Sequence, residues 1–294
     1  MAQLTGVLAT AHSPGLTGFP ERADPVRRAR VMAGFAEAAG RIRSLRPDAI
    51  VAVSVEHFTN FFLANLPAFA VATGERHLGP VTEEMAAFLG IPQRHYPGDR
   101  VLGTHIYRYA LAHDFDPSLA DGGFDFDENF CVPLELLGAA DVPVVPIVVN
   151  GVNPPYPTAR RCYAFGRMLR DAIEAAETAD SVVVLATGGL SHWVGMPQAG
   201  TIDEAFDRDF LARLEAGDAA WLTDYDDDQI EAAGNGAHEI RTWLVAAGAA
   251  GVPFEILAYQ PTPEWLTGTA VAAARMPEPA AAPGGPRTSD AAPR

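Results

Sequence analysis

Residues 48–55 read Asp48-Ala-Ile-Val-Ala-Val-Ser-Val55, and this apolar run decides the fold. Short runs rich in valine and isoleucine are typical of strands that are buried on both faces. Before it, residues 25–45 place apolar side chains mainly three and four positions apart, which predicts an amphipathic helix capped by Asp24. Residues 4–10 form another apolar run. The order strand, helix, strand is that of a βαβ unit in a parallel sheet.

The later chain repeats this order. Residues 142–149 and 181–186 are strand-like, and residues 158–178 between them are helical in pattern. The prolines in 142–149 predict an edge strand or a strand that begins late. We therefore predict an α/β fold, with one domain over residues 1–276 and a central, largely parallel or mixed sheet flanked by helices. Residues 277–294 are rich in proline and alanine, which predicts a disordered tail.

The charge balance excludes several classes of partner. Asp and Glu number 37 against 21 Lys and Arg, for a formal net charge of −16. The average field of such a chain repels nucleic acid and anionic lipid, and an anionic substrate would need a local arginine. The two cysteines, Cys131 and Cys162, are too few for a disulfide framework and predict free thiols in a reducing cytoplasm. No apolar run approaches the length of a membrane helix, so we expect a soluble cytoplasmic protein.

Three histidines directly follow predicted strands. His12 follows the run 4–10, His57 follows 48–55, and His192 ends the segment Thr187-Gly-Gly-Leu-Ser-His192 after a third strand. The carboxyl ends of parallel strands meet at one edge of a sheet, where open α/β sheets place their ligands. For His192 the alternative is a core histidine bonded to a backbone carbonyl. Histidines without such a position are expected to be surface or packing residues: His77, His95, His105 and His113.

A carboxylate at a helix start completes the candidate site. The turn Gly234-Asn-Gly236 opens a predicted helix and places His238 and Glu239 in its first turn, from which a carboxylate can reach a neighbouring site. The alternative is a simple first-turn charge favoured by the helix dipole. The dipole equally explains the acidic segment 122–129 ahead of a helix at 132–137. The acidic run 224–228 lacks the spacing of a calcium loop and is read as a solvated loop.

Two imidazoles and one carboxylate on one face of a metal leave adjacent positions open. This arrangement suits iron(II) that must bind a substrate and dioxygen together. The remaining histidine would be free for proton transfer, because its ordinary pKa lies near neutrality.

The sequence resembles the class III extradiol ring-cleavage dioxygenases over residues 4 to about 270. The resemblance rests on seven short fragments that occur in the family's order: His12-Ser-Pro, Glu56-His-Phe-Thr-Asn-Phe-Phe62 with Pro67, Pro133-Leu-Glu, Asn150-Gly-Val, Gly188-Gly-Leu-Ser-His192, His238-Glu-Ile-Arg-Thr-Trp243 and Pro263-Glu-Trp265. Each fragment is weak alone, and their common order carries the signal.

The resemblance implies a function and roles for particular residues. His12, His57 and Glu239 would bind Fe(II) at the carboxyl ends of the strands, and His192 would be the acid/base residue. The substrate would be a catechol, or an aminophenol or hydroxypyridone, whose ring is opened with insertion of both atoms of O2. The resemblance also implies a homo-oligomer and allows a small accessory subunit.

One departure from the family's pattern concerns a second acid/base group. The family commonly has Asp-His-Gly where this chain reads Asp127-Glu128-Asn129. Either Glu128 takes over the acid/base role, or the substrate carries a basic or altered group. Two other functions stay open, since neither the three ligands nor the fold identifies the metal: a zinc- or other metal-dependent hydrolase on the same scaffold, and a non-catalytic metal-binding relative.

Overall fold

The protein is organised around an eight-stranded mixed sheet in a computed structural model that describes residues 2–277. The strand order is β6-β3-β7-β2-β8-β1-β10-β9. Four parallel strands form its centre, and they are β7 (Val144–Val149), β2 (Ala49–Val55), β8 (Ser181–Thr187) and β1 (Gln3–Thr10). The α/β class with a mixed sheet is confirmed. All but the first residue of the predicted tail, 277–294, lies outside the described residues.

The two edges of the sheet make it mixed. On one side β10 (Thr267–Ala274) runs antiparallel to β1, and β9 (Phe254–Thr262) runs antiparallel to β10. On the other side β3 (Phe69–Ala72) is antiparallel to β7, with β6 (Ser118–Ala120) parallel to β3. Strand β10 was not predicted, because its sequence Thr-Gly-Thr-Ala-Val-Ala-Ala-Ala is dominated by residues with weak strand preference.

Strand β7 corrects one expectation and supports its alternative. It lies between β3 and β2, so it is not an edge strand, although it does begin late, after Pro143. Pro146 is tolerated because the pairing with β3 covers only Ile147 to Val149. Pro146 has no backbone N–H to donate, but it lies outside the residues of β7 that pair with β3, so that pairing loses no hydrogen bond.

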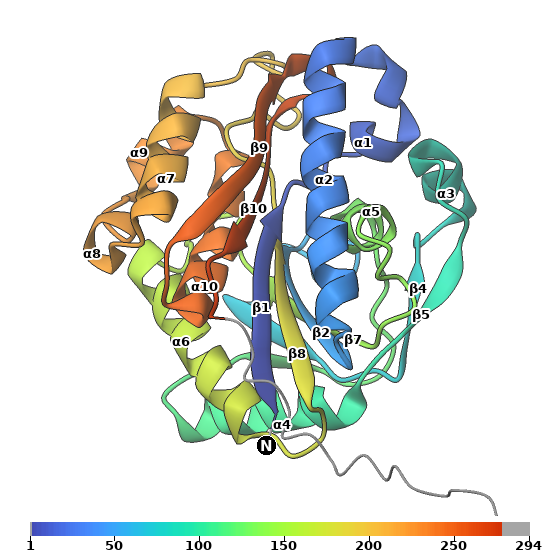
Figure 1. The fold of residues 1–294 in the computed structure, drawn as a ribbon, viewed down its shortest axis with the longest axis vertical. Helices are drawn as coiled ribbons and strands as arrows, with labels where there is room; N and C mark the ends of the chain where they lie inside the picture. The colour runs from blue at the N-terminus through green and yellow to red at the C-terminus, as the bar shows by residue number, and fades with distance from the viewer. Residues whose placement is uncertain (1, 278–294) are drawn as a thin grey trace, which may run out of the picture.

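Helices cover both faces of the sheet. Strand residues alternate between two cores: Val51 and Val53 pack on one face, and Ile50 and Ala52 on the other. The first face is covered by α4 (Arg100–Ala112), α6 (Ala159–Ala175) and α10 (Ile240–Ala250), and the second by α2 (Pro25–Leu45) and α5 (Glu128–Leu136). In Figure 1, α2 runs beside β1 and β10, whereas α6 and α10 lie together on the other side of these strands.

Helix α2 has the predicted bounds and cap. The Asp24 carboxylate accepts hydrogen bonds from the backbone N–H groups of Val26 and Arg27, both at 3.0 Å. The acidic run 224–228 is only partly the solvated loop that was predicted. Asp226 caps α9 (Asp227–Ala232) by accepting from the backbone N–H of Gln229, and Asp227 pairs with the buried Arg241, because an orphan helix donor and a buried guanidinium each need an acceptor.

The remaining elements are short and connect these layers. They are α1 (Gly15–Gly18), η1 (Pro20–Arg22), the hairpin of β4 (Arg76–Gly79) and β5 (Arg94–Pro97), α3 (Glu83–Leu89), α7 (Glu204–Ala216), α8 (Ala219–Leu222), η2 (Ala237–Glu239) and η3 (Pro263–Trp265). Among the helices of residues 2–277, none combines the length and apolar character needed to cross a bilayer. Cys131 and Cys162 are buried free thiols.

Candidate metal centre

Three strand ends bring three histidines to one edge of the sheet. Strand β8 lies between β1 and β2, and Thr10 of β1 is in register with Thr187 of β8. The residues that follow these parallel strands therefore leave the sheet side by side. His12 comes two residues after β1, His57 two residues after β2, and His192 five residues after β8.

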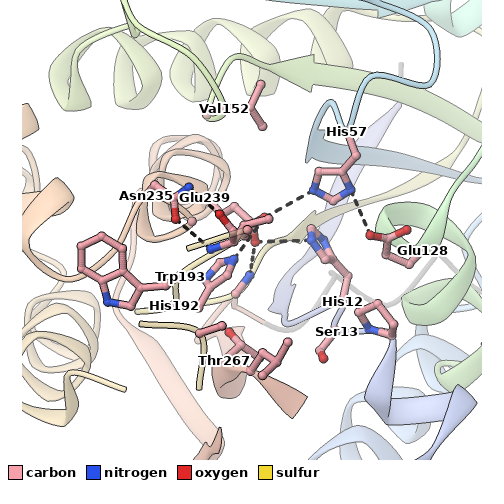
Figure 2. A pocket seen from close by; sticks show the side chains of 18 of the residues that line it. His12, Ser13, His57, Glu128, Val152, His192, Trp193, Asn235, Glu239 and Thr267 are labelled. Carbon is pink, nitrogen blue, oxygen red and sulfur yellow. Dashed lines mark hydrogen bonds and ion pairs between the residues drawn. The ribbon is translucent and has the colours of Figure 1, made fainter. Parts of the chain in front are cut away.

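The carboxylate of Glu239 lies among the three imidazole rings (Figure 2). Its Oε2 is 3.3 Å from His12 Nε2, and its Oε1 is 3.4 Å from His57 Nε2 and 3.7 Å from His192 Nε2. Ligand atoms of His12, His57 and Glu239 all lie within 4.8 Å of one another, which suits a single metal ion. The structure thus brings together the residues that were predicted as ligands.

In His12 and His192, the ring nitrogen Nδ1 has a partner outside the centre, so Nε2 faces Glu239. His192 Nδ1 donates to the carbonyl of Leu190 at 2.8 Å. His12 Nδ1 lies 3.2 Å from Thr187 Oγ1, which donates its own hydrogen to the carbonyl of Asn129 and therefore accepts from His12. Nδ1 of each ring thus has a partner outside the centre, which leaves Nε2 as the atom that faces the centre, as in many metal-binding and base-like histidines.

His57 is backed by two carboxylates. Its Nδ1 lies 3.3 Å from Glu128 Oε1 and 3.4 Å from Asp127 Oδ2, although neither oxygen meets the angle of a good hydrogen bond. Asp127 is held in turn, because it accepts from the backbone N–H of Asn129 at the start of α5 and from the hydroxyl of Thr59. Either carboxylate favours a proton on Nδ1 of His57, which leaves Nε2, 3.4 Å from Glu239 Oε1, as the atom available to a metal.

Opposite charges in the centre shift one another's pKa values toward the charged forms. Burial alone lowers the pKa of His57, but the nearby carboxylates of Asp127 and Glu128 raise it well above the ordinary value. Burial raises the pKa of Glu239, but facing His12 and His192 hold it well below its usual range. The pKa of His192 is likewise raised, since the charge of Glu239 outweighs burial. Without a metal, the anionic Glu239 is balanced by imidazolium, which a cation would displace.

A buried ion network fixes the turn that carries Glu239. Arg241, the second residue of α10, is fully buried and donates to the carbonyl of Pro157 at 2.9 Å and to Asp227 at 2.5 Å. It also donates to His238 Nδ1, and His238 Nε2 faces Glu231 at 2.8 Å. His238 therefore turns away from the centre while Glu239 turns into it. Glu239 lies in η2, a 3₁₀ turn ahead of α10, and not in the first turn of that helix.

Two glycines allow the rings and backbones to approach. A Cβ at Gly236 would stand 2.1 Å from His192 Nε2, and a Cβ at Gly189 would stand 2.4 Å from Thr267 Oγ1. Both positions therefore need a residue without a side chain, and Gly189 donates its N–H to Glu239 Oε2 at 2.5 Å.

The loop of His192 is supported by a buried acid. The Asp207 carboxylate accepts from the backbone N–H of Ser191 at 2.7 Å and from the hydroxyl of Tyr259 at 2.8 Å. Asp207 is fully buried, and burial raises its pKa to about 6. The carboxyl group thus fixes the backbone next to His192 without touching the imidazole.

A cavity of about 540 Å³ opens beside the histidines. His12, His57, Glu128, His192 and Glu239 line its polar end. Its remaining walls are mainly apolar and include Phe58, Val152, Trp193, Val194, Trp265 and Leu266. The volume and the mixture of apolar walls with a few polar groups suit a small aromatic molecule.

Sequence reasoning missed several residues that support the centre. Asp127 was read only as part of a fragment, although its place directly before Glu128 and the helix could have suggested it. Thr187, which orients His12, and Asp207, which holds Ser191, carried no local signal, because their partners are more than ten residues away. The four other histidines lie apart from the centre as expected, and His77 is a packing residue stacked on Phe126.

Comparisons with known proteins agree with this geometry. Residues 6–270 match the family described as the catalytic LigB subunit of aromatic ring-opening dioxygenase. A 2,3-dihydroxyphenylpropionate/2,3-dihydroxicinnamic acid 1,2-dioxygenase from Paraburkholderia xenovorans (strain LB400) is 29% identical, over 87% of this chain and 93% of its own. The enzyme of the same name from Rhodococcus rhodochrous is 26% identical, over 92% and 98%. An uncharacterized protein of Escherichia coli K12 shares the fold, with a TM-score of 0.53 and 17% identity over 91% of this chain and 99% of that one.

Proposed function

Because this chain belongs to the family of catalytic LigB subunits of aromatic ring-opening dioxygenases, we propose that it is an Fe(II)-dependent extradiol dioxygenase. It would open the ring of an aromatic compound with two adjacent hydroxyl groups and insert both atoms of O2. The observation that carries this proposal is the convergence of His12 Nε2, His57 Nε2 and the Glu239 carboxylate beside the cavity.

The donor set fits iron(II). Two neutral imidazoles and one carboxylate form a facial set, and in each ligand histidine the Nδ1 faces an acceptor that leaves Nε2 free. When bound, iron(II) would supply a place where the diol and dioxygen meet and through which electrons can pass between them. The side chains of His12 and Glu239 are each 6% exposed and that of His57 is 23% exposed, so the ligands lie at the buried end of the cavity.

His192 would move the proton of a substrate hydroxyl. Its Nδ1 donates to Leu190, so in the neutral ring Nε2 carries the lone pair, and this atom faces the cavity side of Glu239. A base in this position can take a hydroxyl proton as the diol binds and can return it to the opened product. Packing against Gly236 fixes the ring for both steps.

Glu128 would act in a different way from a simple proton donor. Its carboxylate lines the cavity and also backs His57, so it can hold a proton from the substrate only by weakening its contact with that ligand. We propose that Glu128 both orients His57 and accepts a proton from the aromatic substrate. We further propose that the protein is cytoplasmic, in keeping with its two free thiols, and that it forms a homo-oligomer, with or without a small accessory subunit.

The experiment is anaerobic reconstitution with iron(II), followed by addition of air and a catechol while oxygen uptake is recorded. With ¹⁸O2, two labelled oxygen atoms should appear in a yellow ring-opened product. His57→Ala should lose both iron and uptake, and His95→Gln, which changes a histidine outside the centre, should lose neither. Uptake that never occurs with iron(II), combined with hydrolysis that requires zinc, would establish the hydrolase alternative.

A further inference from the structure

Among residues 2–277, no arginine or lysine lines the cavity beside the metal centre. All 21 basic residues of the chain are arginines, and in residues 2–277 none of them lines the cavity. Arg241, which is buried near the turn of Glu239, is already bound to Asp227 and to the carbonyl of Pro157. A carboxylate on the ring of a substrate would therefore find no fixed cationic side chain.

The cavity does contain an acid besides the metal ligand. Glu128 lines it with 18% of its side chain exposed, and among the described residues the only ion pair of this carboxylate is with His57. The oxygen atoms of Glu128 thus retain acceptor capacity toward the cavity, because an ionised carboxylate has about four acceptor positions. An anionic group in the cavity would be repelled by Glu128, and a cationic one would be attracted.

Two neutral polar side chains of the wall already have partners. The hydroxyl of Ser13 donates to the carbonyl of Trp265 at 2.7 Å. The amide of Asn235 bonds both backbone groups of Val194, at 2.8 and 3.0 Å. Beyond them the wall is apolar, and in Figure 2 Val152 projects toward the cavity from the side opposite Thr267. An uncharged alkyl or aryl group can pack there, whereas a carboxylate would lose its hydration without gaining a partner.

From this distribution of charge, and resting on the proposed dioxygenase function, we propose that the site selects aromatic diols whose ring substituent is uncharged or cationic and discriminates against anionic ones. Glu128 supplies the repulsion, and the lack of an arginine leaves it uncompensated. The substrate named for the relatives carries a propionate, so this chain would differ from them in the charge it accepts.

The test compares three catechols that differ in the charge of the substituent at ring position 3: propyl, 2-aminoethyl and propionate. Dissociation constants are measured by titration calorimetry on the iron(II)-loaded enzyme without oxygen, so that binding is read without turnover. We expect the propyl and aminoethyl compounds to bind at least about tenfold more tightly than the propionate. The proposal is overturned if the propionate binds as tightly as the propyl compound, or if none of the three binds.

Three variants distinguish an effect of charge on binding from an effect of shape. Val152→Arg places a cation in the wall and should tighten binding of the propionate at least about tenfold, while Val152→Gln, of similar length but uncharged, should not. Glu128→Gln should reduce the difference in dissociation constant between the propyl and propionate compounds. If neither Val152→Arg nor Glu128→Gln changes that difference, shape and not charge sets the selection and the proposal is wrong.

The same titrations distinguish this inference from the proposed function. If the propyl compound binds preferentially but admission of air gives no oxygen uptake, the dioxygenase proposal fails and the charge preference stands. If oxygen uptake and ring opening occur with the propionate as readily as with the propyl compound, the charge preference fails and the dioxygenase proposal stands.

Discussion

Glu239 Oε2 accepts a hydrogen bond from the backbone N–H of Gly189, with 2.5 Å between nitrogen and oxygen. This bond joins the turn before α10 to the loop after β8, so the carboxylate and the loop of His192 hold each other in place. The other oxygen of Glu239 faces His57 and His192.

Substitution of Glu239 by glutamine should abolish tight metal binding. The amide removes the charge that balances the cation, and the iron(II) affinity should fall at least about 100-fold. Equilibrium dialysis with iron(II) measures this loss. Glu255→Gln changes an exposed glutamate paired with Arg41 and should bind iron as the wild type does. Normal iron affinity in Glu239→Gln would remove this residue from the ligand set.

Substitution of His192 by glutamine should separate catalysis from metal binding. The variant should keep its iron, because His12, His57 and Glu239 remain. Turnover should fall by about 10²–10⁴-fold, the usual contribution of a positioned acid/base group. Iron content and kcat measured on one preparation check this, and loss of iron in proportion to activity would instead make His192 a ligand.

Glu128→Gln and Glu128→His test the second acid/base position. The amide cannot take up a proton, so kcat should fall about tenfold or more, whereas histidine should restore part of it. Steady-state kinetics on a panel of catechols would measure both. Wild-type turnover by both variants on the best substrate would leave Glu128 without a catalytic role.

We expect the buried Arg241 to contribute far more to the free energy of unfolding than an exposed arginine does. Arg241→Ala leaves Asp227, His238 and the carbonyl of Pro157 without their donor and should lower the free energy of unfolding by about 2–4 kcal/mol. Arg208→Ala removes an exposed pair with Glu204 and a contact over the ring of Tyr259, and should cost about 1 kcal/mol or less. Urea denaturation of both variants gives the comparison, and equal costs would contradict the role of the network.

Asp207 should make stability depend on pH. Burial raises its folded pKa to about 6, above the ordinary 3.8, so the folded state holds this proton more tightly than the unfolded state. The stabilisation is therefore complete below about pH 4 and is lost as the pH rises through 6, by on the order of 3 kcal/mol. Asp207→Asn removes this contribution. The difference in unfolding free energy between variant and wild type should change between pH 4 and 7, and a constant difference would contradict the assignment.

Local patterns in the sequence predicted most of the fold. Apolar runs and a three-to-four spacing located β1, α2 and β2, and the ends of these strands pointed to His12 and His57. Local patterns do not predict the order of the strands across the sheet. Nothing near residues 181–187 indicates that β8 inserts between β1 and β2. Strand β10 was missed because packing against its neighbours, and not intrinsic preference, makes its alanines a strand.

Only the residues that face the centre directly could be predicted from the sequence. His12, His57, His192 and Glu239 stand beside recognisable turns, so their types and places suggested a metal centre. The groups that orient them, such as Thr187 for His12 and Asp127 for His57, act across distances in sequence that only the folded chain closes. The absence of arginine from the cavity is likewise a property of three-dimensional placement, since arginines are plentiful in the chain.

The insertion of β8 between β1 and β2 also orders the events of biosynthesis. The first two strands cannot pair with each other in the native sheet, and they must wait for a strand made more than 120 residues after β2. Glu239 is translated later still. A nascent chain on the ribosome therefore presents His12 and His57 long before their carboxylate partner exists, and a complete iron-binding pocket can form only after the ribosome has translated about four fifths of the chain.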